Sequence, residues 1–212
     1  MSTSLRADVA SEGYLLLADI SGYTSFLSGV EQAHGVDFSV GIPEGFGLLG
    51  AVLDAVVAGV EPDFEVANLE GDAVFAFALA STLDNRGAEV LTQLRAVHRT
   101  FHAKRVEARA AVLHDCTACP LVGNLDLKMV LHRGHAVRQN VGSRTELLGP
   151  AVNIAHRLLK NNIQAQMGYR PYLFVTDAAA VALGMPEVGT EHSETYPDVG
   201  SIRGRVVELT DA

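Results

Sequence analysis

Residues 13–24 read Gly-Tyr-Leu-Leu-Leu-Ala-Asp-Ile-Ser-Gly-Tyr-Thr, an apolar run that ends at an acid and continues into a glycine-containing segment. A short apolar run bounded by turn residues is typical of a buried strand. The pattern therefore predicts a strand over 13–20 that runs into a turn. It places the carboxylate of Asp19 at the end of that strand.

A second acid stands at a similar position. Two apolar runs, 64–69 and 73–79, are separated by Glu-Gly-Asp, which predicts a hairpin with Asp72 at its turn. If this hairpin lies beside the strand over 13–20, the carboxylates of Asp19 and Asp72 face one point. Paired carboxylates suit a Mg²⁺ site for phosphoryl transfer, because Mg²⁺ binds hard oxygen ligands. The alternative is that both acids are turn residues that hydrogen-bond their own backbone.

The remaining pattern predicts an α+β fold with a ferredoxin-like order, in which helices cover one side of an antiparallel or mixed sheet. We expect a single domain over 13–212, preceded by a tail over 1–12. The expected helices are 44–60, 85–107 and 150–161, with a short one after Asp177. The other expected strands are 106–113, 125–132, 172–175 and 205–209, and 184–204 is expected to be a loop-like insertion.

Composition limits the classes of function. The 212 residues carry 16 Lys and Arg against 25 Asp and Glu, a formal charge of −9, which argues against bulk nucleic-acid binding. A hydrophobic content of 48% is enough for a sizeable core. Without a long apolar run or a signal-like start, we expect a cytoplasmic protein that does not bind membranes.

A third segment carries polar groups of a different kind. Residues 149–157 read Gly-Pro-Ala-Val-Asn-Ile-Ala-His-Arg, and the proline suits the first turn of a helix. Asn153 and Arg157 are four residues apart and share one face of that helix. Arginine supplies fixed donors for a phosphate, and asparagine can orient a sugar hydroxyl. The alternative is an ordinary exposed polar face.

Together these stretches resemble the class III nucleotidyl cyclase catalytic domain, the domain of adenylyl and guanylyl cyclases, over roughly residues 13–209. Residues 19–24 match the family's Asp-Ile-x-Gly-Phe/Tyr-Thr stretch, and Gly71 with Asp72 matches its hairpin. Residues 149–157 match its Gly-x-x-Val-Asn-x-Ala-x-Arg helix without a gap. A closer resemblance is to an uncharacterised bacterial branch of cyclase-like domains.

The resemblance implies an enzyme that converts a purine nucleoside triphosphate to the 3′,5′-cyclic monophosphate and pyrophosphate. Asp19, Asp72 and the backbone carbonyl of Ile20 would hold two Mg²⁺ or Mn²⁺ ions. Asn153 would orient the ribose, and Arg157 would stabilise the transition state. The family builds two shared sites in a head-to-tail homodimer, with the metals and the Asn/Arg helix in different protomers.

The family's phosphate-binding Lys-Gly-Lys turn corresponds to residues 203–205, Arg-Gly-Arg, ahead of the expected last strand, so Arg203 would contact the β- and γ-phosphates. Adenylyl cyclases read the base with a lysine and an aspartate at the positions that hold Asn68 and Glu146 here. Because Glu146 can still accept from an exocyclic amine, ATP is favoured over GTP. The alternative is a catalytically silent domain that binds a nucleotide or a partner.

The two cysteines are spaced as Cys116-x-x-Cys119 and follow His114. With His114 and a histidine from elsewhere, such as His102 or His132, they would complete a zinc site. A single Cys-x-x-Cys pair is more often part of an incidental or structural loop, and a redox pair is the third interpretation, although Pro120 stands where a redox motif would open a helix. The sequence leaves these three interpretations open.

Overall fold

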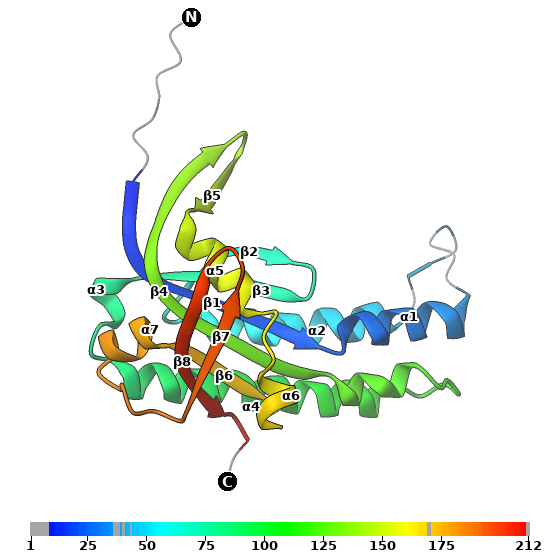
Figure 1. Cartoon of the computed structure of the whole chain (residues 1–212). Helices are drawn as coiled ribbons and strands as arrows, with labels where there is room; N and C mark the ends of the chain where they lie inside the picture. Colours follow the sequence, from blue (N-terminus) through cyan, green and yellow to red (C-terminus); the bar gives the residue numbers. More distant parts are fainter. Residues whose placement is uncertain (1–8, 36–38, 40, 43, 169–170, 211–212) are drawn as a thin grey trace, which may run out of the picture.

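The structure is a computed structural model that describes residues 9–35, 39, 41–42, 44–168 and 171–210 (Figure 1). The strands are β1 (Val9–Ser21), β2 (Glu65–Glu70), β3 (Ala73–Leu79), β4 (Asp126–Val141), β5 (Arg144–Leu148), β6 (Tyr172–Thr176), β7 (Thr190–Tyr196) and β8 (Gly200–Glu208). The helices are α1 (Tyr23–His34), α2 (Glu44–Val60), α3 (Ala80–Leu83), α4 (Gly87–Ala111), the 3-10 helix η1 (Cys119–Asn124), α5 (Pro150–Leu158), α6 (Ile163–Met167) and α7 (Asp177–Ala182).

The strands form one eight-stranded mixed sheet in the order β2-β3-β1-β4-β6-β8-β7, with β5 paired to β4. Only the β4–β6 pair is parallel among the strand pairs described. The first four strands and the helices between them give the order β2-β3-β1-β4 of a ferredoxin-like unit. The α+β fold class and the ferredoxin-like, mixed-sheet architecture expected from the sequence are confirmed.

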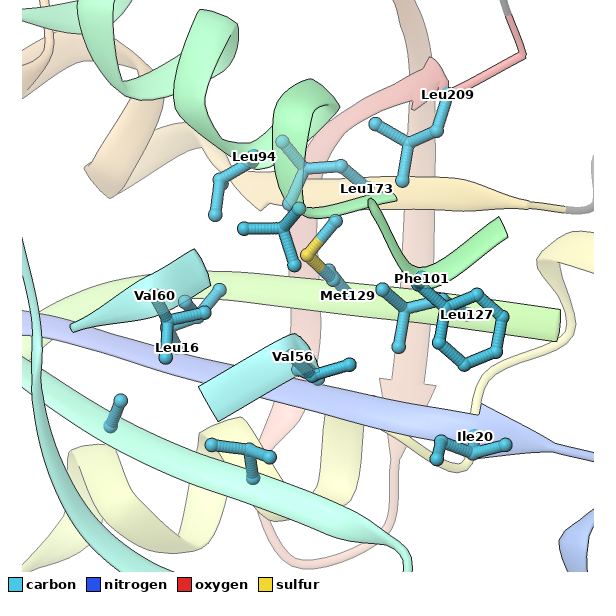
Figure 2. Packing of buried hydrophobic residues seen from close by; sticks show 14 of the residues in the cluster. Leu16, Ile20, Val56, Val60, Leu94, Phe101, Leu127, Met129, Leu173 and Leu209 are labelled. Atoms are coloured by element: carbon cyan, nitrogen blue, oxygen red, sulfur yellow. The ribbon is translucent and has the colours of Figure 1, made fainter. Parts of the chain in front are cut away.

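The larger core lies between one face of the sheet and helices α2 and α4. Figure 2 shows Leu16 of β1 beside Val56 and Val60 of α2, with Leu94 and Phe101 of α4 closing the same cluster. These helical residues recur every three or four positions, so each helix presents one apolar stripe to the sheet. This packing fixes the end of β1 that carries Asp19.

The opposite face of the sheet carries helices α5 and α6. Val152, Ala155 and Leu158 of α5 pack on Leu17 and Phe75 in a second core cluster. The expectation that helices cover only one side was therefore wrong. Because β1, β3 and β4 alternate apolar side chains toward both faces, the sheet needs a cover on each.

Helix α1 was not predicted, although Tyr23, Phe26, Leu27 and Val30 have helical spacing. Phe26 and Val30 are buried, and the helix ends at Gly35, whose φ of 56° lies in the left-handed region. The buried face of α1 is therefore narrow and consists of these two side chains. It connects the end of β1 to the region of the cysteines.

The strand predicted over 106–113 was wrong, because α4 continues to Ala111. Alanine is the best helix former, and Ala108 lies seven residues after Phe101 on the same buried stripe. The loop predicted over 184–204 was also wrong, since it contains β7 and the start of β8. β7 is polar because it is the edge strand, and only Glu194 in it is buried.

Strand β1 begins at Val9, so residues 9–12 of the expected tail belong to the sheet. Residues 1–8 lie outside the described residues. At the far end, the β4–β5 hairpin curves away from the body of the domain (Figure 1). Within the described ranges, no helix combines the length and the apolar character that crossing a bilayer requires.

Candidate active site

The structure brings Asp19 and Asp72 together at one end of neighbouring strands. Asp19 pairs with Ala73 in the β1–β3 register, and the backbone N–H of Ile20 donates to the carbonyl of Asp72 at 3.2 Å. The turn between β2 and β3 reverses at Gly71, whose φ is 67°, a conformation that glycine adopts without strain. Asp19, Ile20 and Asp72 line one cavity of about 280 Å³.

The charges in this cavity match a cation site. Burial raises the pKa of Asp72, and the nearby carboxylate of Asp19 raises it further. Lys128 partly compensates, because its Nζ lies 3.0 Å from Oδ2 of Asp19. Two carboxylates that repel each other at a partly buried point supply the hard oxygen ligands that Mg²⁺ or Mn²⁺ binds. The donor set therefore fits a divalent cation.

Helix α5 presents its polar residues beside the same end of β1. Gly149 precedes it with a φ of 136°, and Pro150 opens the first turn. A cavity of about 980 Å³ is lined by Asp19 and Lys128 on the sheet and by Asn153 and Arg157 on α5. The chain thus places the acid of β1 and the polar face of α5 on one hollow surface.

Arg157 has a partner that the sequence did not reveal. Its guanidinium lies 2.8 Å from Oδ2 of Asp198, in the turn between β7 and β8. The two side chains are 49% and 68% exposed, so this ion pair contributes at most about 1 kcal/mol to stability. It defines where the guanidinium points in the free chain.

Arg203 lies within β8 and not ahead of the last strand as expected, because that strand begins at Gly200. Its side chain is 80% exposed and lies 3.4 Å from Asp177. It lines a separate cavity of about 320 Å³ together with Asp177, Glu191 and Arg205. The structure therefore does not bring Arg203 into the cavity that holds Arg157.

The two residues expected to read the base also lie outside the cavities of Asp19 and Arg157. Asn68 on β2 is directly opposite Phe75, so it points to the face that α5 covers. Glu146 on β5 is opposite Gln139 in the β4–β5 hairpin. Asn68 and Glu146 thus belong to different parts of the sheet.

A contact between β2 and α5 was missed as well. Nε2 of His156 lies 2.9 Å from Oε2 of Glu70, and its ring packs edge-on against Phe75. This contact ties the β2–β3 hairpin to the helix that carries Asn153 and Arg157. Lys128 was visible in the sequence as a basic position in an alternating strand, but only the register, which sets it opposite Asp19, reveals its role.

Cys116 and Cys119 are both free, and two histidines accompany them. These are His114, as expected, and His34 from the end of α1. The expected fourth ligands were wrong. His132 is buried in β4 and lies 3.1 Å from the hydroxyl of Thr176, and His102 lies on α4 beside His98.

Comparison with solved structures identifies the class of fold, which is that of class III adenylyl and guanylyl cyclase catalytic domains. The guanylyl cyclase Cya2 superposes with a TM-score of 0.68 at 12% identity, covering 97% of this chain and 96% of that one. The adenylyl cyclase CyaB from P. aeruginosa gives a TM-score of 0.65 at 15% identity, covering 96% and 97%. The guanylate cyclase domain of RhGC from Catenaria anguillulae, in complex with GTP, gives 0.58 at 11%, covering 94% and 97%.

The chain belongs to a family described as "Protein of unknown function (DUF2652)", whose model matches residues 49–169. It is also 29% identical over 164 residues to the uncharacterized protein Rv2561/Rv2562 of Mycobacterium tuberculosis. That alignment covers 76% of this chain and 72% of the mycobacterial protein. The resemblance to cyclase domains, within an uncharacterised branch, is thus confirmed at the level of the fold.

Proposed function

We propose that the protein is a nucleotidyl cyclase that forms a 3′,5′-cyclic monophosphate and pyrophosphate from a purine nucleoside triphosphate. The observation that carries this proposal is the acid pair of Asp19 and Asp72 at one strand end, with the Asn153–Arg157 face of α5 on the adjoining hollow surface, so that two copies meeting there would each bring their α5 to the other's acids. Each group has a chemical task in an in-line attack of the ribose 3′ oxygen on the α-phosphorus. The cyclase fold supports the same assignment.

Asp19 and Asp72, with the backbone carbonyl of Ile20, would hold two Mg²⁺ or Mn²⁺ ions. When bound, such ions lower the pKa of the attacking hydroxyl and neutralise the leaving phosphates. Through such ions the carboxylates would position the α-phosphate, and the partial burial of Asp72 would reduce the water that competes for the cation. This assignment draws its support from the paired acids and their mutual repulsion.

Asn153 donates to or accepts from the ribose and orients the 3′ oxygen, and Arg157 donates to the oxygens that gain charge in the transition state. Arg203 remains the proposed contact to the β- and γ-phosphates. Since Arg203 lines a different cavity in the single chain, we propose that it reaches the triphosphate only in an assembled dimer.

We propose a head-to-tail homodimer in which the acids of one protomer face α5 of the other. Class III cyclases divide their sites in this way, and the 980 Å³ cavity is an open surface that a second copy would cover. A monomer should then be inactive. For the base, we propose that Glu146, which lies outside both cavities in the single chain, would accept a hydrogen bond from the exocyclic amine of adenine in the dimer, which favours ATP over GTP, while Asn68 is compatible with either.

The direct test is the purified protein with ATP or GTP and Mn²⁺, assayed for cyclic product. Asp72→Ala should reduce the product to background, because the pair loses one of its carboxylates. Asp54→Ala removes an exposed acid on α2 and should leave the rate unchanged. Equal background-level product from the native chain and from Asp72→Ala would reject the proposal.

The second candidate is a catalytically silent domain that binds a nucleotide, and one observation favours it. Lys128 already provides a positive charge 3.0 Å from Asp19, where a metal would compete with it. Calorimetry with a non-hydrolysable triphosphate separates the two functions: binding without turnover in the native chain supports the silent domain. Lys128→Met then tests the cause, because appearance of product only in this variant would show that the lysine blocks the site.

A further inference from the structure

A second group of ligand-type side chains lies away from the acid pair. His34 comes from the last turn of α1, His114 and Cys116 from the segment after α4, and Cys119 from the start of η1. One ligand atom from each of the four lies within 4.8 Å of the other three. Nε2 of His34 is 3.2 Å from the Sγ atoms of both Cys116 and Cys119.

These separations are close to those of a tetrahedral zinc site. With Zn–S bonds of about 2.3 Å and Zn–N bonds of about 2.1 Å, the ligand atoms lie about 3.4–3.8 Å from one another. The distances from Nε2 of His34 to the two sulfurs, 3.2 Å each, are within a few tenths of an ångström of that arrangement, and all four ligand atoms lie within 4.8 Å of one another. Two thiols and two imidazoles are a complete ligand set for zinc.

The backbone around Cys116 also suits a metal thiolate. The N–H groups of Ala118 and Cys119 both donate to Sγ of Cys116 at 3.3 Å. Donors aimed at a sulfur stabilise its negative charge, which the bound thiolate carries. The tight turn of the Cys-x-x-Cys segment thus brings the two sulfurs together and also aims two N–H donors at one of them.

One of the histidines has the partner that metal-bound imidazoles commonly use. Nδ1 of His114 lies 3.0 Å from Oε2 of Glu44, at the start of α2. A ligating histidine usually donates its other ring N–H to a carboxylate, which fixes the tautomer and the ring orientation. The contact with Glu44 leaves Nε2 of His114 for the metal.

We propose that His34, His114, Cys116 and Cys119 bind one structural zinc ion. All four positions of a tetrahedral ion are filled by protein, so none is open to a substrate. The ion would join the C-terminal end of α1 to the segment between α4 and η1. Helix α1 needs such an anchor because Phe26 and Val30 are its only fully buried side chains in the described structure.

The site has two competing explanations. A reversible disulfide between Cys116 and Cys119 uses the same sulfurs but gives the two histidines no task. A cluster of hydrogen bonds without an ion uses the imidazoles but requires no stoichiometric metal. The proposal does not depend on the cyclase function, because its readouts are metal content, spectroscopy and stability.

The first experiment measures the metal content of the full chain, purified under reducing conditions without chelators, by plasma mass spectrometry. We expect about one zinc per chain. Cys116→Ser and His34→Ala should each reduce it to near zero. His102→Ala is the matched control, since it removes a histidine outside the cluster, and it should retain the full amount.

The second experiment replaces zinc with Co²⁺. The native chain, stripped with a chelator and titrated with Co²⁺, should develop the visible bands of tetrahedral cobalt and the near-ultraviolet thiolate charge-transfer band, saturating at one equivalent. Glu44→Gln should retain the spectrum but weaken zinc affinity by about 10- to 100-fold, because the outer partner of His114 is lost. This titration also covers the case in which a ligand variant does not fold.

Two results would overturn the proposal. One is a native chain free of zinc that gives no tetrahedral cobalt spectrum. The other is a His34→Ala chain that keeps one zinc and an unchanged cobalt spectrum. If the zinc-free protein instead shows a Cys116–Cys119 disulfide by mass spectrometry, the pair is a redox pair and the histidines are not ligands.

Discussion

The two ends of helix α1 lie beside two groups of ligand-type side chains with opposite chemical character. At the N-terminal end, the first turn lines the cavity of Asp19 and Asp72, where every ligand atom is an oxygen. At the C-terminal end, His34 joins two sulfurs and a second imidazole. Hard cations prefer the donor atoms of the first group and zinc those of the second, so one short helix separates two groups of side chains that suit different ions.

The difference also concerns accessibility. The acid cavity opens onto the surface that carries Arg157, so a substrate can reach it. In the thiol and imidazole cluster only Cys119 is fully buried, while His34 and His114 are exposed, but the four side chains would fill every position of a tetrahedral ion and leave none for a substrate. An open oxygen site is the arrangement that catalysis needs, and a closed sulfur and nitrogen site is the one that stability needs.

The largest expected effect comes from replacing one ligand-type residue in each of the two groups, in separate variants. Asp19→Asn should lower cyclic product to background, because it removes one of the paired carboxylates, but should retain about one zinc per chain. Cys116→Ser should lose the zinc. Product and metal content measured on the same preparations check this prediction, and loss of zinc in Asp19→Asn would contradict the separation of the two sites.

A smaller effect is expected on stability when the zinc is removed. An ion that binds only the folded chain, at about 1,000 times its dissociation constant, contributes about 4 kcal/mol, which for a chain of this size is on the order of 10 °C in Tm. Thermal unfolding with and without a strong chelator measures this shift. In Cys116→Ser the chelator should have no effect, and an equal shift there would point to another metal site.

The smallest effect concerns Asp72 itself. Its pKa in the folded chain lies above the ordinary value of 3.8, because burial and then the charge of Asp19 disfavour ionisation. The free energy of unfolding therefore decreases as the pH rises from 3.8 through the raised pKa of Asp72. Asp72→Asn removes this decrease, because an amide does not ionise. The variant should be slightly more stable than the native chain at neutral pH, because it no longer carries a charge that burial and Asp19 disfavour.

Denaturant unfolding at acidic and neutral pH checks the last prediction. The gain of Asp72→Asn over the native chain should shrink at a pH below 3.8, where both states of the native chain carry a protonated carboxyl. A variant that is less stable than the native chain at neutral pH would show that Asp72 holds the turn by hydrogen bonds. Asp72→Asn should also lack the proposed cyclase activity.

Local patterns in the sequence predicted the parts of the site that lie within single segments. The apolar strand before Asp19, the hairpin turn before Asp72 and the spacing of Asn153 and Arg157 are all readable within ten or so residues. Contacts between distant segments cannot be predicted in this way. The β1–β4 register places Lys128 opposite Asp19, and the β7–β8 turn places Asp198 beside Arg157, and in each pair the two residues lie far apart in the sequence.

The zinc ligands make the same point. His114, Cys116 and Cys119 are close in sequence and were predicted together, but His34 is 82 residues from Cys116. Only the packing of α1 against η1 selects it from the eight histidines of the chain. The β7 strand was missed for another reason, because its polar residues at an edge lack the apolar alternation that predicts a strand.

The contact between Arg157 and Asp198 has a consequence for which molecules can bind. The guanidinium of Arg157 is already paired with the carboxylate of Asp198, so an anionic ligand that binds Arg157 must displace that carboxylate. The contact is solvated and weak, and a polyanion such as a triphosphate displaces Asp198 at little cost, whereas an uncharged nucleoside gains nothing from the exchange. On the proposed function, the turn between β7 and β8 would give anionic ligands a small advantage over uncharged ones at Arg157, and this advantage should fade as salt screens the charges.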